Sequence, residues 1–339
     1  MKKALILGIE SSCDDTAAAI ISGRKILSNI TNTQLIHASH GGVVPELAGR
    51  AHMENMVRIV DMALDKAQIQ LNDLDAIAFT VGPGLQVSLV VGTSFAKGLA
   101  LALHKPMIAV HHMKAHILSH FIEEEGMVAP SFPYLCLTVS GGHTQLVVVH
   151  SALEMEIIGK TIDDAAGEAF DKTAKMLGFS YPGGPLIDAH SKNGNPHAFL
   201  FSKPKIKGLD FSFSGLKTSV LYTLQAATKE NPDFIAQNRN DLCASIQESI
   251  SSILMDKLKK AQQATGIKHI AVSGGVSVNS GLRKKLFAWQ EAQPDISVHL
   301  AHPKYCTDNG AMVAITGSLY FDEGSFADQS VAADARLQW

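Results

Sequence analysis

The chain has 339 residues, of which 46% are hydrophobic and 18% are charged. This balance excludes a disordered chain, and the length suffices for two domains of ordinary size, each with its own core. The formal net charge is −3, so no overall basic field indicates a nucleic-acid-binding protein. The four cysteines show no C-x-x-C pairing, which favours reduced thiols and a cytoplasmic location.

Neither a signal peptide nor a membrane span is expected. The apolar run near the N-terminus ends at Glu10, which is too short for the apolar region of a signal peptide. No uninterrupted apolar stretch is long enough to cross a bilayer. The sequence therefore predicts a cytoplasmic protein without a membrane partner.

Strands and helices are expected to alternate along the chain. In the first half, the predicted order is a hairpin of strands 4–9 and 17–22, a helix ending near Lys66, strand 76–80, helix 86–103, strand 107–110 and a helix to about Phe121. In the second half, it is a hairpin of strands 134–140 and 145–150, a helical insertion at about 161–228, strand 269–272, helix 280–289, strand 296–300 and a helix from about Asp308 to Tyr320.

The two halves therefore share one order of elements without sharing sequence. This weak repeat predicts an α/β protein made of two similar domains that face a cleft. The expected first domain covers residues 1–130 and the second covers 131–325, including the insertion. The C-terminal helix could also pack back on the first domain.

Two histidines follow the last strand of the first half. His112 and His116 are four residues apart, so on a helix both imidazoles point from one face, as metal ligands often do. With 15 histidines in the chain, such spacing also arises by coincidence, and His116 with His120 has the same spacing. Met113 replaces the glutamate that follows the first histidine of a zinc protease, which disfavours that class.

Asp308 follows the matching strand of the second half. If the halves are related by a pseudo-two-fold axis, Asp308 meets the two histidines across the cleft. Two imidazoles and one carboxylate suit a zinc or iron ion with open coordination positions. The alternative is that Asp308 caps its helix, for which the run Thr307-Asp308-Asn309 is equally suitable.

Glycine turns follow three strands: Gly82-Pro83-Gly84, Ser140-Gly141-Gly142 and Ser273-Gly274-Gly275. Such turns expose backbone N–H groups that bind phosphate, although each alone could be a simple chain reversal. Together they favour nucleotide binding.

The carboxylates that could accept bonds from a ribose are Asp171 and Asp188. Asp14 and Asp15 are candidates for proton transfer, or they belong to a solvated turn.

One run extends from Lys97-Gly98 through Leu103-His104-Lys105-Pro106 to His112-Met113-Lys114-Ala115-His116-Ile117. This run resembles the signature of a known family, the tRNA N6-adenosine threonylcarbamoyltransferases called TsaD. Further stretches resemble the same family in chain order: GIESSCDDT at 8–16, GGVVPELAGRAH at 41–52, VSGGHTQL at 139–146, IDDAAGEAFDKTAKMLG at 162–178, YPGGP at 181–185, LDFSFSGLKT at 209–218, SGGVSVN at 273–279 and CTDNGAM at 306–312.

The resemblance implies the actin-like, sugar-kinase and heat-shock-ATPase fold, which is ribonuclease H-like. It implies transfer of the threonylcarbamoyl group from threonylcarbamoyl-adenylate to the N6 amine of adenosine 37, in tRNAs that read codons beginning with A. It also implies two helper proteins, a homologous TsaB-like subunit and a small TsaE-like ATPase.

The resemblance also assigns residues. One divalent ion, Fe²⁺ or Zn²⁺, is expected on His112, His116 and Asp308, which selects this pair of histidines. Substrate contacts are expected from the following residues: Thr138, Val139, Ser140, Gly141, Gly142, Asp171, Gly184, Asp188 and Asn279. Thr138 stands where archaeal and eukaryotic relatives place a metal-binding tyrosine, so a fourth protein ligand is not expected. No general base is assigned.

Two other functions compete with this interpretation. An ATP-dependent phosphotransferase of the sugar-kinase type would explain the fold and the glycine turns but not the two histidines and the aspartate. A non-catalytic scaffold of the same fold would have no reason to keep these ligands and turns together.

Overall fold

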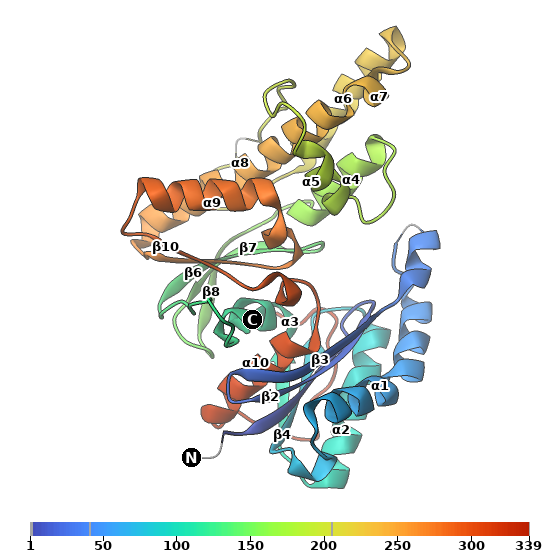
Figure 1. Cartoon of the computed structure of the whole chain (residues 1–339), viewed down its shortest axis with the longest axis vertical. Helices are drawn as coiled ribbons and strands as arrows, with labels where there is room; N and C mark the ends of the chain where they lie inside the picture. The colour runs from blue at the N-terminus through green and yellow to red at the C-terminus, as the bar shows by residue number, and fades with distance from the viewer. Residues whose placement is uncertain (1–2, 41, 205, 339) are drawn as a thin grey trace. The chain divides into compact units, whose positions relative to one another are not determined.

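The computed structural model describes residues 3–40, 42–204 and 206–338 (Figure 1). Gly41, the first residue of the 41–52 motif, lies outside the described residues. The chain divides into two compact units. The first unit consists of Met1–Ala129 together with Ala301–Trp339, and the second unit is Pro130–Leu300. Within the described residues, each unit contains one five-stranded mixed sheet.

The sheet of the first unit has the strand order β3-β2-β1-β4-β5. Its strands are β1 (Leu5–Glu10), β2 (Asp15–Ser22), β3 (Lys25–Thr33), β4 (Ala76–Gly82) and β5 (Met107–His111). Strands β1, β2 and β3 pair antiparallel, whereas β1, β4 and β5 pair parallel. Every residue of β4 is buried, as expected for a central parallel strand that is covered on both faces.

Helices cover both faces of this first sheet (Figure 1). Helices α1 (Pro45–Ala67) and α2 (Gln86–Leu103) form a core with one face, which includes Leu7 and Ile9 of β1. Helix α10 (Gly310–Asp322) contacts the opposite face, where the Cβ position of Gly8 lies 2.4 Å from the backbone nitrogen of Ala314. Because this approach leaves no room for a side chain at residue 8, helix and strand pack backbone to backbone.

Helix α10 and the chain around it therefore belong to the first unit. The predicted second domain, 131–325, differs from the structure, in which the second unit ends at Leu300. The reason is packing: Gly317 of α10 faces Ala78 of β4, and α10 has buried residues on all its sides. Asp308 lies in the first unit with the two histidines, so its assignment to the second half was wrong.

The sheet of the second unit has the order β10-β9-β6-β7-β8. Its strands are β6 (Tyr134–Val139), β7 (Thr144–Val149), β8 (Met155–Lys160), β9 (His269–Ser273) and β10 (Ser297–Leu300). Numbering the strands of each unit in chain order gives the same sheet order and the same pairing directions in both units. The predicted α/β repeat is confirmed, and the edge strands β3 and β8 are additions that the sequence did not predict.

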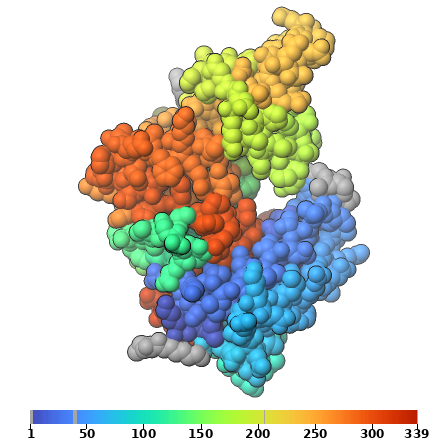
Figure 2. Space-filling model, in the orientation of Figure 1, coloured from blue at the N-terminus to red at the C-terminus, as the bar shows by residue number. Residues whose placement is uncertain are grey.

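The second unit carries most of the remaining helices. They are α4 (Ala166–Met176), α5 (Gly184–Ser191), α6 (Ser214–Glu230), α7 (Phe234–Gln237), α8 (Arg239–Thr265) and α9 (Ser280–Ala292). Figure 2 shows α4 to α6 as the yellow-green to gold atoms of this unit. Their core includes Phe170, Phe211 and Phe213, which pack with residues of the sheet.

One described helix, α2, is long and apolar enough to cross a membrane by length and composition. It packs on α1 and β4 and buries small residues such as Gly92, Ala96 and Ala100.

Candidate metal centre and substrate turns

Helix α3 (His112–Leu118) begins directly where β5 ends. The preceding residue, His111, caps the helix, because its Nδ1 accepts a hydrogen bond from the backbone nitrogen of Met113 at 3.2 Å. This cap fixes the start of the helix at His112, so His112 and His116 share one face. His116 is almost fully buried, and His112 is 9% exposed.

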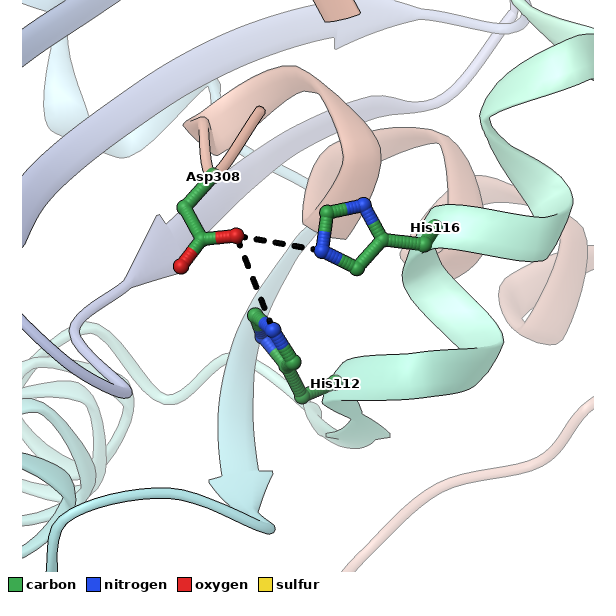
Figure 3. A group of neighbouring side chains, drawn as sticks. All are labelled: His112, His116 and Asp308. Carbon is green, nitrogen blue, oxygen red and sulfur yellow. Dashed lines mark hydrogen bonds and ion pairs between the residues drawn. The ribbon is translucent and has the colours of Figure 1, made fainter. Parts of the chain in front are cut away.

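Both imidazoles point toward the carboxylate of Asp308 (Figure 3). The Nε2 atom of His116 lies 3.1 Å and that of His112 3.6 Å from Oδ1 of Asp308. The two rings meet edge to face, with centroids 4.8 Å apart. The three ligand atoms lie within 4.8 Å of one another, so these side chains form one group. His120 is outside it, with Nδ1 at 3.0 Å from the carbonyl oxygen of Ile117.

Asp308 does not cap helix α10. The helix begins at Gly310 rather than at Asp308, and its cap is Asn309, whose Oδ1 accepts a bond from the Met312 nitrogen at 3.0 Å. The alternative role of Asp308 as a cap was therefore wrong. Its carboxylate is directed at the imidazoles instead.

The structure adds a carboxylate that the sequence analysis missed. Glu10, at the end of β1, is fully buried, and its Oε2 lies 3.2 Å from Nδ1 of His112. Burial raises the pKa of Glu10, but the His112 imidazole outweighs this and holds it below its ordinary value. Burial lowers the pKa of His112, but the Asp308 and Glu10 carboxylates outweigh this and raise it to about 9.

These groups fit a divalent cation. Each ring nitrogen of His112 faces a carboxylate, Glu10 at Nδ1 and Asp308 at Nε2, which favours positive charge at this position. The donors that converge are two imidazole nitrogens and one carboxylate oxygen, a set typical of zinc and of non-haem iron. A carboxylate behind a ligating histidine is typical of such centres.

We expect a specific pH dependence of stability in the metal-free protein. Folding raises the pKa of His112 from 6.5 to about 9. The stabilisation of the folded state by the ion pairs of His112 with Asp308 and Glu10 is therefore fully present below pH 6.5, and it is lost as the pH rises through 9. The whole change is on the order of 3 kcal/mol. Melting temperatures of the metal-free parent and His112→Gln should therefore differ most below pH 6.5 and converge above pH 9. Parallel profiles of the two proteins would contradict this prediction.

The turn after β1 is held from two helices. His52 of α1 is fully buried, with Nε2 at 2.9 Å from the Cys13 carbonyl and Nδ1 at 2.8 Å from the Thr16 hydroxyl. Ser88 of α2 donates to the same Cys13 carbonyl at 3.1 Å. Burial raises the pKa of the neighbouring Asp15 to about 7. A proton-transfer role for Asp14 or Asp15 stays a prediction.

In the second unit, the Ser140-Gly141-Gly142 turn joins β6 to β7. The Ser140 nitrogen donates to the His143 carbonyl at 2.8 Å, and the His143 nitrogen donates to the Ser140 hydroxyl at 3.1 Å. A Cβ added at Gly141 or Gly142 meets no atom within 4 Å, so the turn borders open space. Behind it, Gly167 of α4 packs so closely that its Cβ position lies 2.6 Å from the Ser140 backbone oxygen.

The two residues that precede this turn are part of the core. Thr138 and Val139 are fully buried in β6, and the Thr138 hydroxyl accepts a bond from Ser273 at 3.2 Å. Their side chains face the interior, so contacts with a substrate would have to come from the backbone.

The remaining predicted substrate residues are linked to neighbouring elements by hydrogen bonds. Oδ1 of Asp171 accepts bonds from the Gly183 and Gly184 nitrogens at 2.8 and 3.2 Å. Oδ1 of Asp188 accepts bonds from the nitrogen and hydroxyl of Ser280 at 2.9 and 2.6 Å. In both aspartates, Oδ2 makes no hydrogen bond with any residue in the described part of the chain.

Asn279 is already engaged at both ends of its amide. Its Oδ1 caps α9 by accepting a bond from the Leu282 nitrogen at 3.0 Å, and its Nδ2 donates to Gln247 at 2.6 Å. The side chain therefore positions the start of α9, next to Asp188 and Ser280.

Comparison with known proteins identifies the family. The model of the TsaD family, described as tRNA N6-adenosine threonylcarbamoyltransferase, matches residues 25–315. The chain belongs to the TsaD family. A tRNA N6-adenosine threonylcarbamoyltransferase from Riemerella anatipestifer is 56% identical over 340 residues, covering 100% of this chain and 99% of the relative. The predicted resemblance to the TsaD family is confirmed.

Two solved structures show the same fold at low sequence identity. HypF from T. kodakarensis has a TM-score of 0.63 at 15% identity, covering 97% of this chain and 49% of HypF. Component A of (R)-2-hydroxyglutaryl-CoA dehydratase from Acidaminococcus fermentans has a TM-score of 0.55 at 15% identity, covering 95% of this chain and 99% of component A. The predicted actin-like, sugar-kinase type of fold is confirmed.

Proposed function

We propose that this chain transfers a threonylcarbamoyl group to the N6 amine of adenosine 37 in tRNAs that read codons beginning with A. The donor is threonylcarbamoyl-adenylate. The observation that carries the proposal is 56% identity, over the whole chain, to a relative named for this transferase activity. A sugar-kinase phosphotransferase and a non-catalytic scaffold are not favoured, because the family model that matches is that of the transferase.

The chemistry fits the site residues. An acyl-adenylate already carries an activated leaving group, so the enzyme has to orient the donor and the amine and to stabilise developing charge. In the second unit, the backbone N–H groups of Gly141 and Gly142 suit the phosphate, because open space lies beside these two glycines. The Oδ2 atoms of Asp171 and Asp188 suit ribose hydroxyls, because the Oδ1 atoms are already bonded.

The first unit would supply a divalent ion. His112, His116 and Asp308 are its proposed ligands, and Fe²⁺ and Zn²⁺ are the candidates. Such an ion acts as a Lewis acid toward substrate oxygens. The residues of the chain hold it: His112 and His116 present Nε2 from one face of α3, and Asp308 provides the anionic oxygen.

The proposal includes a cytoplasmic location and two helper proteins, a TsaB-like homologous subunit and a TsaE-like small ATPase. The need for helpers is supported by the net charge of the chain, which is −3 and does not favour binding to tRNA phosphates. Two of its lysines, Lys257 and Lys285, are also bonded within the chain. Lys257 is buried and donates to the carbonyls of Ile206 and Gly208 at 2.9 and 2.7 Å, and Lys285 pairs with Glu248 at 2.7 Å. Phosphate neutralisation dominates tRNA affinity, so the chain alone should bind tRNA weakly.

Reconstitution tests the function. We expect the complete mixture of chain, helpers, threonylcarbamoyl-adenylate and tRNA to form N6-threonylcarbamoyladenosine, detected by mass spectrometry of digested tRNA. The chain alone should fall well short of the multiple-turnover rate, and its tRNA binding should weaken steeply with salt. A tRNA with guanosine at position 37 is the matched control. No product in the complete mixture would contradict the function, whereas full turnover by the chain alone would contradict only the need for helpers.

A further inference from the structure

Glu10 is the buried carboxylate next to the proposed metal ligands. Three donors surround it: Oε1 accepts the Ser12 nitrogen at 2.6 Å, and Oε2 accepts the Thr80 hydroxyl at 2.6 Å and faces Nδ1 of His112 at 3.2 Å. These partners come from the turn after β1, from β4 and from α3, so the carboxylate is fixed from three directions. A carboxylate held this way is an acceptor at both oxygens.

We propose that Glu10 is a positioning residue for the metal centre, which keeps the proton of His112 on Nδ1 and the Nε2 lone pair directed at the ion. The inference rests on the metal centre of the proposed function. An imidazole binds a metal through an unprotonated nitrogen, so the tautomer decides whether His112 can be a ligand. An ionised carboxylate can only accept, and it therefore selects the tautomer with hydrogen on Nδ1.

The neighbouring hydroxyl cannot make the same selection. Ser12 Oγ lies 3.1 Å from the same Nδ1, but a hydroxyl can donate or accept and suits either tautomer. The second histidine has no equivalent support, because Nδ1 of His116 is buried without a hydrogen-bond partner in the described part of the chain. Glu10 therefore supports His112 specifically.

The substitution Glu10→Gln reverses the selection with almost no change of shape. The backbone nitrogen of Ser12 needs an acceptor, so the amide oxygen of the substituted side chain would take the Oε1 position. The NH₂ group of the same amide would then stand at the Oε2 position and donate to Nδ1 of His112. That arrangement puts the ring proton on Nε2, where it blocks the metal.

The test compares Glu10→Gln with Ser12→Ala, which removes the other neighbour of Nδ1. Zinc affinity is measured by competition with a chromophoric chelator, and melting curves of the metal-free proteins show that both are folded. We expect Glu10→Gln to weaken zinc binding by about 10- to 100-fold, and Ser12→Ala to weaken it much less. In zinc-loaded parent protein with ¹⁵N-labelled histidine, Nδ1 of His112 should carry the proton, a result that needs no variant.

The outcomes separate this inference from the proposed function. Equal zinc affinity of Glu10→Gln and the parent, or an unprotonated Nδ1 of His112 in the zinc-loaded parent, would overturn the role of Glu10. A larger loss in Ser12→Ala than in Glu10→Gln would do the same. A parent that binds neither zinc nor ferrous ion would overturn the metal centre itself and the inference with it. Failure to modify tRNA by a protein that binds zinc as expected would count against the transferase function alone.

Discussion

In the Asp308→Asn variant, we expect zinc or ferrous ion to give almost none of the thermal stabilisation that it gives the parent. Asparagine keeps the shape of Asp308 but removes the anionic ligand that lies 3.1 Å from Nε2 of His116 and 3.6 Å from that of His112. A ligand that binds only the folded state stabilises it by about 2.7 kcal/mol at a hundredfold excess over its Kd. For a chain of 339 residues, this is a shift of a few degrees.

The measurement is the difference between the metal-loaded and metal-free melting temperatures of one variant. This difference is needed because the Asp308 carboxylate also raises the pKa of His112. Loss of the carboxylate therefore changes the melting temperature of the metal-free protein at neutral pH as well. We also expect transferase activity to fall by about 100-fold or more, since a Lewis acid provides several kcal/mol of charge stabilisation.

Asn309→Ala is the matched control one residue along the chain. Asn309 caps α10, so its loss should cost about 1 kcal/mol of stability in the metal-free and metal-loaded proteins alike. Its metal-dependent shift should equal that of the parent. If Asp308→Asn kept the full metal-dependent shift of the melting temperature, Asp308 would not be a ligand, and other residues would have to bind the ion.

The sequence predicted the strands other than β3 and β8, in their order along the chain, because most of these strands carry apolar runs. Strands β3 and β8, which each lie at one edge of a sheet, were missed because polar residues interrupt their apolar positions, in the sequences KILSNITNT and MEIIGK. The boundary near 300 also escaped. Periodicity identifies α10 as a buried helix but does not say which sheet it covers. The fit of Gly8 against α10, and of Gly317 of α10 against Ala78 of β4, is visible only in three dimensions.

Spacing gave two candidate pairs, His112 with His116 and His116 with His120, because helical geometry puts residues four apart on one face. The family resemblance selected the first pair. Asp308 could not be separated from Asn309, because both residue types cap helices. Glu10 was missed because a glutamate followed by Ser-Ser-Cys-Asp-Asp resembles a solvated turn. Its burial depends on β1 lying next to β4 and on α3 following β5, contacts between segments about 70 and 100 residues apart.

The second large effect is expected in Gly142→Val, which should lower the affinity for adenine nucleotide by about tenfold or more. The reason is steric. The branched side chain would occupy the open space beside the backbone N–H groups of Gly141 and Gly142, where the phosphate is proposed to bind. Because a Cβ at residue 142 meets no atom within 4 Å, the substitution should leave the fold intact. Titration calorimetry with AMP or ATP measures the affinity, and a melting curve checks the fold.

The control is Gly98→Ala, in helix α2 of the first unit, where an added Cβ also meets nothing within 4 Å. It should fold and bind nucleotide like the parent, which shows that adding a side chain at an open glycine is harmless in itself. A folded Gly142→Val protein with unchanged nucleotide affinity would remove the turn from the substrate site. The Oδ2 atoms of Asp171 and Asp188 would then have to recognise the adenylate without a phosphate-binding turn next to α4, and the donor site would need another location.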